Sequence, residues 1–417
     1  MRNMTAFPIA AVRDAFPALA LTDEGRPRIY LDNPAGTQVP QRVADAASRC
    51  LLETSANLGG YFNTSVAAGE VVDRAHRAMA RFLGAASERE IIIGPSMTTL
   101  TFAVSRSLAR SLNPGDEIVV TRMDHDGNIA PWLAIAEERG ATVRWVPFDR
   151  ESWVVEPEAL DAVLSPKTRI VALGYASNLT GSVNDVAALV ARARAVGAIT
   201  YVDAVQFAPH GYIDVQALGC DFLACSSYKF FGPHLGILWG REGLLRDLHA
   251  YKVRPATDEL PWRFETGTPQ IELQAALAAT VEYYEWLGTA VGGSENPRDG
   301  LRAAFEAASA WEADLALRLI EGLSEMRAVT IHGITDANLI RRRVPTVSFT
   351  HASRTPPEIA RELARRNIFV WSGNNYALEV VRSLGVDEAD GVVRIGLAHY
   401  NTPDEVALTL DAITRSS

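Results

Sequence analysis

Cysteine, basic charge and long apolar runs are all scarce in this chain of 417 residues. The three cysteines, Cys50, Cys220 and Cys225, have no repeated spacing, so we expect neither a disulfide framework nor a metal site. Lys and Arg number 40 against 50 Asp and Glu, and no block is strongly basic, so we expect no binding to nucleic acid. No run approaches about 18 uninterrupted apolar residues, so we expect no membrane span.

The N-terminus reads as a poor signal peptide, because Arg13 and Asp14 interrupt its apolar stretch. Apolar residues make up 48% of the chain and charged residues 22%, which is ordinary for a folded protein and excludes disorder as the main state. These features predict a cytoplasmic enzyme or binding protein of about two or three domains.

Strand and helix signals alternate in the middle of the chain, and the strands are apolar almost throughout, as in a sheet covered on both faces. We therefore predict an α/β fold, whose large domain has a mostly parallel sheet of seven strands. The expected strands are 91–93, 117–120, 142–146, 169–173, 199–202, 221–225 and 235–239, with helices at 98–112, 128–139 and 184–196.

The pattern changes after Gly240, where two long helices are expected at 270–288 and 298–324 and a smaller C-terminal α+β domain follows. The last helix should begin at a capping box formed by Thr402 and Glu405. We divide the chain into an N-terminal segment, a large ligand-binding domain and a small domain, at 1–29, 30–288 and 289–417. Strands of the small domain are expected at 328–332, 344–350, 367–370 and 392–395.

Candidate site residues follow the strands, because ligands of open α/β sheets collect at the carboxyl ends of the strands. Lys229 follows 221–225, between aromatic residues and a Gly-Pro turn. Such an apolar setting lowers the pKa of a lysine and prepares it for Schiff-base chemistry. Asp203 ends another apolar strand, where a carboxylate either meets a cation or caps the next helix.

A helix that opens with small hydroxyl residues follows 91–93. Its free N–H groups and Ser96 offer a seat for an anion, although Ser96 alone could simply cap the helix. His125 and Asn178 follow two further strands, where an isolated histidine or a turn asparagine is more often structural.

Together these segments favour pyridoxal 5'-phosphate as cofactor. Its phosphate needs the helix N-terminus, its pyridine nitrogen a carboxylate, and its aldehyde a lysine. No G-x-G-x-x-G motif follows a strand, and no G-x-x-x-x-G-K-[ST] motif exists, so neither a nicotinamide site nor a P-loop is expected.

From residue 30 to the C-terminal helix, the sequence resembles the class V aminotransferase and cysteine desulfurase family of fold-type I pyridoxal-phosphate enzymes. It is most similar to a branch labelled cysteine desulfurase-like. The motifs that carry the resemblance are NPAGT, DHDGNIAPW, SNLTG, VDAVQFAPH, SSYKFFGP, FETGTPQ and VRIGLAHYNTPDEV.

The resemblance implies roles for the matching residues. Lys229 would hold the cofactor and act as acid and base at Cα, Asp203 would pair with the pyridine nitrogen, and His125 would stack on the ring. Further cofactor contacts would come from Ser96, Met97, Asn178, Gln206, Ser226 and Thr268, of which Met97 would use only its backbone.

Two further roles are implied by the same resemblance. Thr268 would reach the phosphate of the neighbouring subunit, so a homodimer with shared active sites is implied. Asn178, Arg394, Trp371 and Tyr376 would face the substrate, with Arg394 holding its carboxylate.

The chain departs from the desulfurase pattern on the loop at 370–380. Tyr376 stands at the position of the persulfide cysteine, Trp371 replaces an arginine, and Tyr228 replaces a histidine before the lysine. We therefore expect an enzyme that acts on an amino acid at Cα and Cβ, as a lyase by β-elimination or as an aminotransferase. A true cysteine desulfurase, an amino-acid epimerase and a non-catalytic scaffold of the same fold remain open alternatives.

Overall fold

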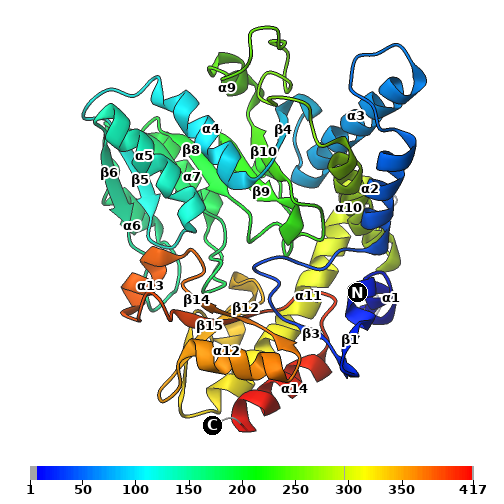
Figure 1. The fold of residues 1–417 in the computed structure, drawn as a ribbon. Coiled ribbons are helices and arrows are strands. Elements are labelled where there is room, and N and C mark those ends of the chain that lie inside the picture. Colours follow the sequence, from blue (N-terminus) through cyan, green and yellow to red (C-terminus); the bar gives the residue numbers. More distant parts are fainter. Residues whose placement is uncertain (1–6, 295, 416–417) are drawn as a thin grey trace.

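The computed structural model describes residues 7–294 and 296–415, and the first six residues of the expected N-terminal segment lie outside them. A seven-stranded sheet forms the large domain, in the order β4-β10-β9-β8-β7-β5-β6 (Figure 1). Its strands pair in parallel except β10, which is antiparallel to both neighbours. The strands are β4 (Ile91–Gly94), β5 (Glu117–Thr121), β6 (Thr142–Val146), β7 (Thr168–Gly174), β8 (Ile199–Asp203), β9 (Phe222–Ser226) and β10 (Gly236–Gly240).

Helices cover both faces of this sheet, and consecutive residues of a strand point to opposite faces. Val119, for example, packs into one core and Ile118 into the other. Helices α4 (Met97–Ala109) and α5 (Ala130–Arg139) cover one face, and α3 (Asn63–Leu83), α7 (Val186–Ala195) and α10 (Ile271–Ala290) cover the other. The expected mostly parallel α/β sheet and its helices are confirmed.

The C-terminal part forms a four-stranded antiparallel sheet in the order β11-β12-β15-β14, beside the large domain (Figure 1). The strand expected at 367–370 does not join this sheet, whose edge strand β14 begins at Trp371. Within 367–370, the two-residue strand β13 pairs in parallel with β3 near the start of the chain. The elements are β3 (Ile29–Tyr30), β11 (Val329–His332), β12 (Thr346–His351), β13 (Ile368–Phe369), β14 (Trp371–Gly373), β15 (Val392–Gly396), α12 (Pro356–Arg365), α13 (Leu378–Leu384) and α14 (Pro403–Arg415).

The long helix α11 (Pro297–Ser324) connects the two parts. Its first half, with Phe305, packs in the core of the large domain, and its second half, with Leu319, packs in the core of the small one. Leu31 also packs in the small core. The division of the chain at 29/30 and 288/289 stays a prediction. Helix α11 and the segment around Leu31 connect the cores of the two domains.

The remaining elements are short or lie at the edges of the large domain. They are α1 (Ile9–Asp14), α2 (Gln41–Glu53), α6 (Pro157–Asp161), α8 (Val215–Leu218), α9 (Glu242–Asp247), β1 (Thr22–Asp23), β2 (Arg26–Pro27) and the 3₁₀ turns η1 (Pro17–Ala20), η2 (Glu88–Glu90), η3 (Asp126–Asn128), η4 (Ser227–Lys229) and η5 (Ala337–Arg342). The capping box at α14 is present, because Thr402 Oγ1 accepts from Glu405 N and Glu405 accepts from Thr402 N.

No described helix combines the length and the apolarity that a bilayer crossing requires. Within residues 7–294 and 296–415, no three His, Cys, Asp or Glu side chains are grouped so as to hold a metal ion.

Candidate active site

A cavity of about 890 Å³ opens at the carboxyl ends of β7, β8 and β9, below the loop that follows β14. Asp203 is the last residue of β8 and Ser226 the last of β9, so the chain turns into the site directly from the sheet. Most of the residues expected from the sequence line this cavity. They are Met97, His125, Asn178, Asp203, Gln206, Ser226, Lys229, Trp371, Tyr376 and Arg394.

Lys229 lies on η4, in a largely desolvated position beside the N-terminal segment. Its Nζ donates to the backbone oxygens of Pro34 and Ala35, the latter at 3.0 Å. Burial, together with the positive charge of Arg394, lowers the pKa of the amine to about 7, while Asp32 and Asp203 oppose this shift. The amine is therefore available in its uncharged, nucleophilic form near neutral pH.

Asp203 is buried, and the one described donor to its carboxylate is the Val205 N–H at 2.8 Å. Burial raises the pKa of Asp203 to about 6, and the Val205 N–H and the Lys229 charge oppose the rise. A carboxylate with so few partners at the end of a buried strand is costly unless a further cationic donor approaches it.

His125 follows β5 and lines the cavity with its ring. Its Nδ1 accepts from the Gly127 N–H at 2.9 Å, so the other ring nitrogen carries the proton of a neutral imidazole. Burial lowers the pKa of His125 to about 4, helped by the charges of Lys229 and Arg394. An uncharged flat ring on the cavity wall suits stacking on an aromatic ligand.

The start of α4 provides the backbone N–H of Met97, which has no partner among the described residues. Ser96 is the N-cap of this helix, and its hydroxyl accepts from Thr99 N at 3.1 Å, so Ser96 does cap the helix and does not line the cavity. The helix start approaches β10 closely, because a Cβ on Gly236 would lie 2.4 Å from Met97 N. Only glycine at 236 leaves room for this approach.

Arg394 is buried in the middle of β15 and reaches the site from the small domain. Its Nη1 donates to Asn178 O at 3.1 Å, its Nη2 lies 3.5 Å from Asp32 Oδ1, and its Nε has no partner among the described residues. Burial lowers the pKa of Arg394 to about 10, and Asp32 opposes this shift. A buried guanidinium with a spare donor is suited to a carboxylate ligand.

The amides of Gln206 and Asn178 complete the inner wall. Gln206 donates to Thr346 Oγ1 at 3.1 Å, and Asn178 donates to Asn375 O at 2.7 Å, while Asn178 Oδ1 has no partner in the described part of the chain. Both residues line the cavity, so each can offer an amide oxygen to a ligand.

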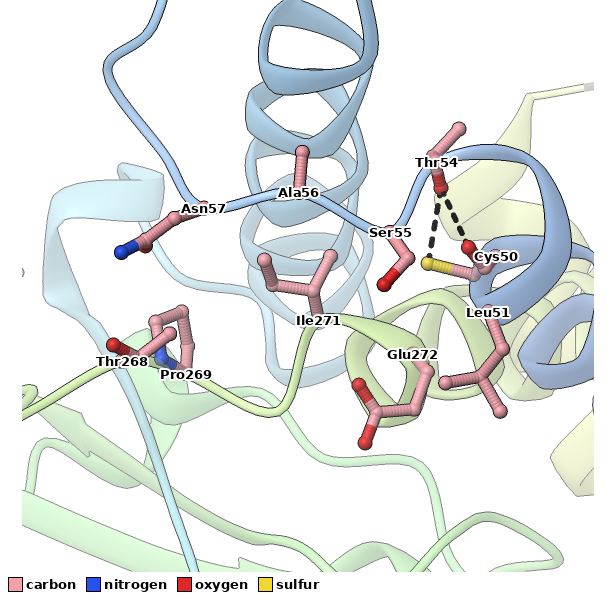
Figure 2. A pocket seen from close by; sticks show the side chains of 10 residues that line it. All are labelled: Cys50, Leu51, Thr54, Ser55, Ala56, Asn57, Thr268, Pro269, Ile271 and Glu272. Atoms are coloured by element: carbon pink, nitrogen blue, oxygen red, sulfur yellow. Dashed lines mark hydrogen bonds between the residues drawn. The ribbon is translucent and has the colours of Figure 1, made fainter.

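Thr268 lies apart from the other expected residues. It lines a second pocket, of about 330 Å³, which shares no described residue with the Lys229 cavity. Figure 2 shows Thr268 and Pro269 just before α10, facing the segment Ser55–Asn57 that follows α2. Within one chain, Thr268 is therefore separate from the cavity.

Sequence reasoning missed three carboxylates: Asp124 and Asp126, which line the cavity, and Asp32, which lies beside Arg394. Asp124 is fully buried and accepts from Thr121 and Asn128, each at 2.7 Å, and burial raises its pKa to about 7. Its position after an apolar strand was a signal of the kind that identified Asp203. Asp32 could not be found this way, because only folding brings it beside Arg394.

The three cysteines are all buried, and none lines the cavity. Cys225 packs in the core under the sheet, and burial raises the pKa of its thiol well above the ordinary range. Burial likewise raises the pKa of Cys220 to about 12. Cys50 lines the Thr268 pocket, where its sulfur accepts from the Thr54 hydroxyl (Figure 2).

The arrangement fits pyridoxal phosphate. The desolvated Lys229 amine and the under-partnered Asp203 carboxylate face one cavity, whose wall holds the neutral His125 ring. These are the groups that the aldehyde, the pyridine nitrogen and the ring face of this cofactor require.

Comparisons with known proteins agree with this chemistry. The family described as Aminotransferase class-V matches residues 29–408. The chain is 35% identical to the aminotransferase-like protein FGM3 of Gibberella zeae, over 97% of each chain. It is 30% identical to a cysteine desulfurase of Pectobacterium carotovorum, over 96% of each chain.

A solved structure has the same fold over the full length. The cysteine desulfurase CsdA of Escherichia coli superposes with a TM-score of 0.85, at 26% identity and with 99% of each chain covered. Sequence, fold and site thus agree, and the chain belongs to the class V aminotransferase family of pyridoxal-phosphate-dependent enzymes.

Proposed function

We propose that this enzyme acts on an α-amino acid at Cα and Cβ, as a lyase or an aminotransferase, without forming a persulfide on the protein. The observation that carries the proposal is the loop after β14, which offers Tyr376 to the cavity while all three cysteines lie elsewhere. A phenol cannot form a persulfide. Cys220 and Cys225 are buried in the core of the large domain, and Cys50 lines the Thr268 pocket, apart from the Lys229 cavity of its own chain.

Arg394 would hold the α-carboxylate of the substrate. Its unpartnered Nε is a donor that no described residue satisfies, and Asp32 and Asn178 O fix the orientation of the guanidinium. The carboxylate would then lie on the small-domain side of the cavity, with Cα turned towards Lys229.

Lys229 would remove and return protons at Cα. A pKa of about 7 allows the amine to accept a proton and to give it back at neutral pH, which is the condition for efficient acid–base catalysis. The bound cofactor supplies an electron sink for the Cα carbanion, and Asp203 would keep its ring nitrogen protonated.

The remaining cofactor contacts are also part of the proposal. Met97 N–H and Ser226 would hold the phosphate beside the Ser96 cap, Gln206 would meet the ring hydroxyl, and Thr268 would serve the phosphate of a second subunit. The enzyme would thus be a homodimer, and we expect it in the cytoplasm.

The lyase and the aminotransferase differ only in the step after Cα deprotonation. Loss of a group from Cβ would give elimination, and transfer of the amino group to a second keto acid would give transamination. The alternatives of a true desulfurase, an epimerase and a silent scaffold each predict a different product, namely alanine with sulfide, the D-amino acid, and none.

The test is a product screen of the purified holoenzyme against a panel of amino acids. Keto acid, ammonia, sulfide, alanine and the D-enantiomer are measured for each. We expect keto acid with ammonia for a lyase. For an aminotransferase we expect keto acid without ammonia, in about one equivalent per site unless a keto acid is added to accept the amino group. Alanine formed from cysteine together with a persulfide trapped on Cys50, Cys220 or Cys225 would contradict the proposal.

A further inference from the structure

The outer end of the cavity is rich in carboxylates that are not matched by free cations among the described residues. Lys229 and Arg394 lie at the inner end, and the outer end is formed by η3, by the loop after β14 and by the loop 386–391 beside it. This outer region holds five carboxylates, on Asp126, Glu379, Asp387, Glu388 and Asp390, against the guanidinium groups of Arg122 and Arg382.

Both of these arginines are already engaged. Arg122 pairs with Glu379, and Arg382 bridges Glu379 at 2.9 Å and Glu388 at 2.8 Å. Asp126 is the member of the group that lines the cavity, and its carboxylate makes neither an ion pair nor a hydrogen bond with any described residue. Burial and the nearby Glu379 raise its pKa, with Arg382 opposing, as expected for a carboxylate that lacks a close cation.

Asn375 provides a second, independent acceptor at the same place. It is 9% exposed, its Nδ2 donates to Gly373 O at 2.9 Å, and its Oδ1 is buried without a partner within residues 7–294 and 296–415. The donor contact fixes which side of the amide is nitrogen, so the free atom is an oxygen. Its loop is joined to η3 by the hydrogen bond from Asp126 N to Tyr376 O at 2.7 Å.

Aromatic faces complete this end of the cavity. Trp371 and Tyr376 line it with side chains that are 54% and 72% exposed, and the Tyr376 ring lies 5.4 Å from that of His125. Aromatic faces attract cations, and unpaired acceptors require N–H donors.

We propose that the outer end of the cavity binds an amino-acid side chain that ends in a cationic nitrogen group, a guanidinium or an ammonium. Asp126 pairs with the charge, Asn375 Oδ1 accepts from an N–H, and Trp371 and Tyr376 cover the group. This inference rests on the proposed function, because it assumes that the same cavity holds the substrate's Cα beside Lys229.

The experiment compares cationic amino acids with neutral ligands of matched shape. L-Arginine is paired with L-citrulline, and L-lysine with L-norleucine. Each is titrated calorimetrically into holoenzyme in which borohydride has fixed the cofactor to Lys229, so that binding is measured without turnover. We expect at least one cationic ligand to bind about tenfold more tightly than its neutral partner.

Variants then test whether Asp126 causes the preference for cationic ligands. Asp126→Asn should abolish it, and Asp14→Asn, which removes an exposed carboxylate at the end of α1, should leave it unchanged. Equal binding of both members of each pair, or a preference that survives Asp126→Asn, would overturn the inference while the proposed function stands. If no amino acid binds the reduced enzyme, the inference fails, whereas the proposed function is judged by the product screen on unreduced holoenzyme.

Discussion

Asp203 is the residue whose function is most open to a direct test. Asp203→Asn keeps the shape of the site and the start of α4, but it removes the anion that would hold the cofactor's ring nitrogen protonated. We expect kcat to fall about a hundredfold or more, by analogy with the loss of one preorganised electrostatic group, while cofactor affinity changes little. Steady-state kinetics and cofactor absorbance measure the two effects, with Asp14→Asn as control. Near-normal turnover would show that Asp203 serves only to accept the Val205 N–H at the turn after β8.

Lys229 should determine how cofactor loading depends on pH. Its pKa of about 7 lies below the ordinary 10.5, so the uncharged amine that attacks the aldehyde predominates above about pH 7. The rate of loading into apoenzyme should therefore rise with pH and level off above pH 7 to 8, rather than rising beyond pH 10. Stopped-flow absorbance measures this rate. A rate that still climbs steeply between pH 8 and pH 10 would mean that the lysine is not desolvated in solution.

At the scale of single residues, the local sequence pattern predicted some site residues and missed others. Lys229 and Asp203 follow apolar strands, so their positions in the site could be inferred from neighbours in sequence. Arg394 lies in the middle of β15, where nothing local distinguishes it from a solvated strand residue, and only the resemblance indicated it. Asp32 and Asp126 carry no sequence signal, because their environment is made by the small domain.

At the scale of elements, strand prediction worked for all seven strands of the large sheet, most of which are buried along most of their length. It was less accurate for 367–370, since β13 is two residues long and its partner, β3, comes from the start of the chain. A partner so distant in sequence leaves no periodic signal near the strand itself. The antiparallel direction of β10 has a different cause: it depends on the turn through η4 and not on the residues of the strand itself.

The loop after β14 carries the prediction that separates this enzyme from persulfide-forming ones. Replacing Cys50, Cys220 and Cys225 together by alanine should leave kcat within about twofold of the parent. The loss of buried sulfur should lower the free energy of unfolding by about 1 kcal/mol at each site. Kinetics and thermal melting measure the two, with Lys229→Ala as an inactive control. A loss of turnover that exceeds the loss of folded protein would restore a catalytic role for a cysteine.

At the scale of the whole molecule, an apolar surface on α2 and the start of α3 has no cover within the described part of one chain. Leu51, Leu52, Tyr61, Phe62 and Val66 are exposed there, and Leu51 lines the Thr268 pocket of Figure 2. Exposed apolar groups gathered on one face mark an interaction surface. A second copy of the chain is the partner that would also give Thr268 a ligand, because the pocket of its own chain does not reach the Lys229 cavity.

We therefore expect a dimer by light scattering at micromolar concentration. Leu52→Lys places a charge in the middle of the apolar surface and should shift the protein towards monomer with weaker cofactor retention. Leu408→Lys, on the similarly exposed face of α14, should do neither. Thr268→Ala should leave the dimer intact and weaken cofactor binding alone, because it removes one phosphate contact. A monomer that stays fully loaded with cofactor would contradict shared active sites, since every phosphate contact would then have to come from one chain.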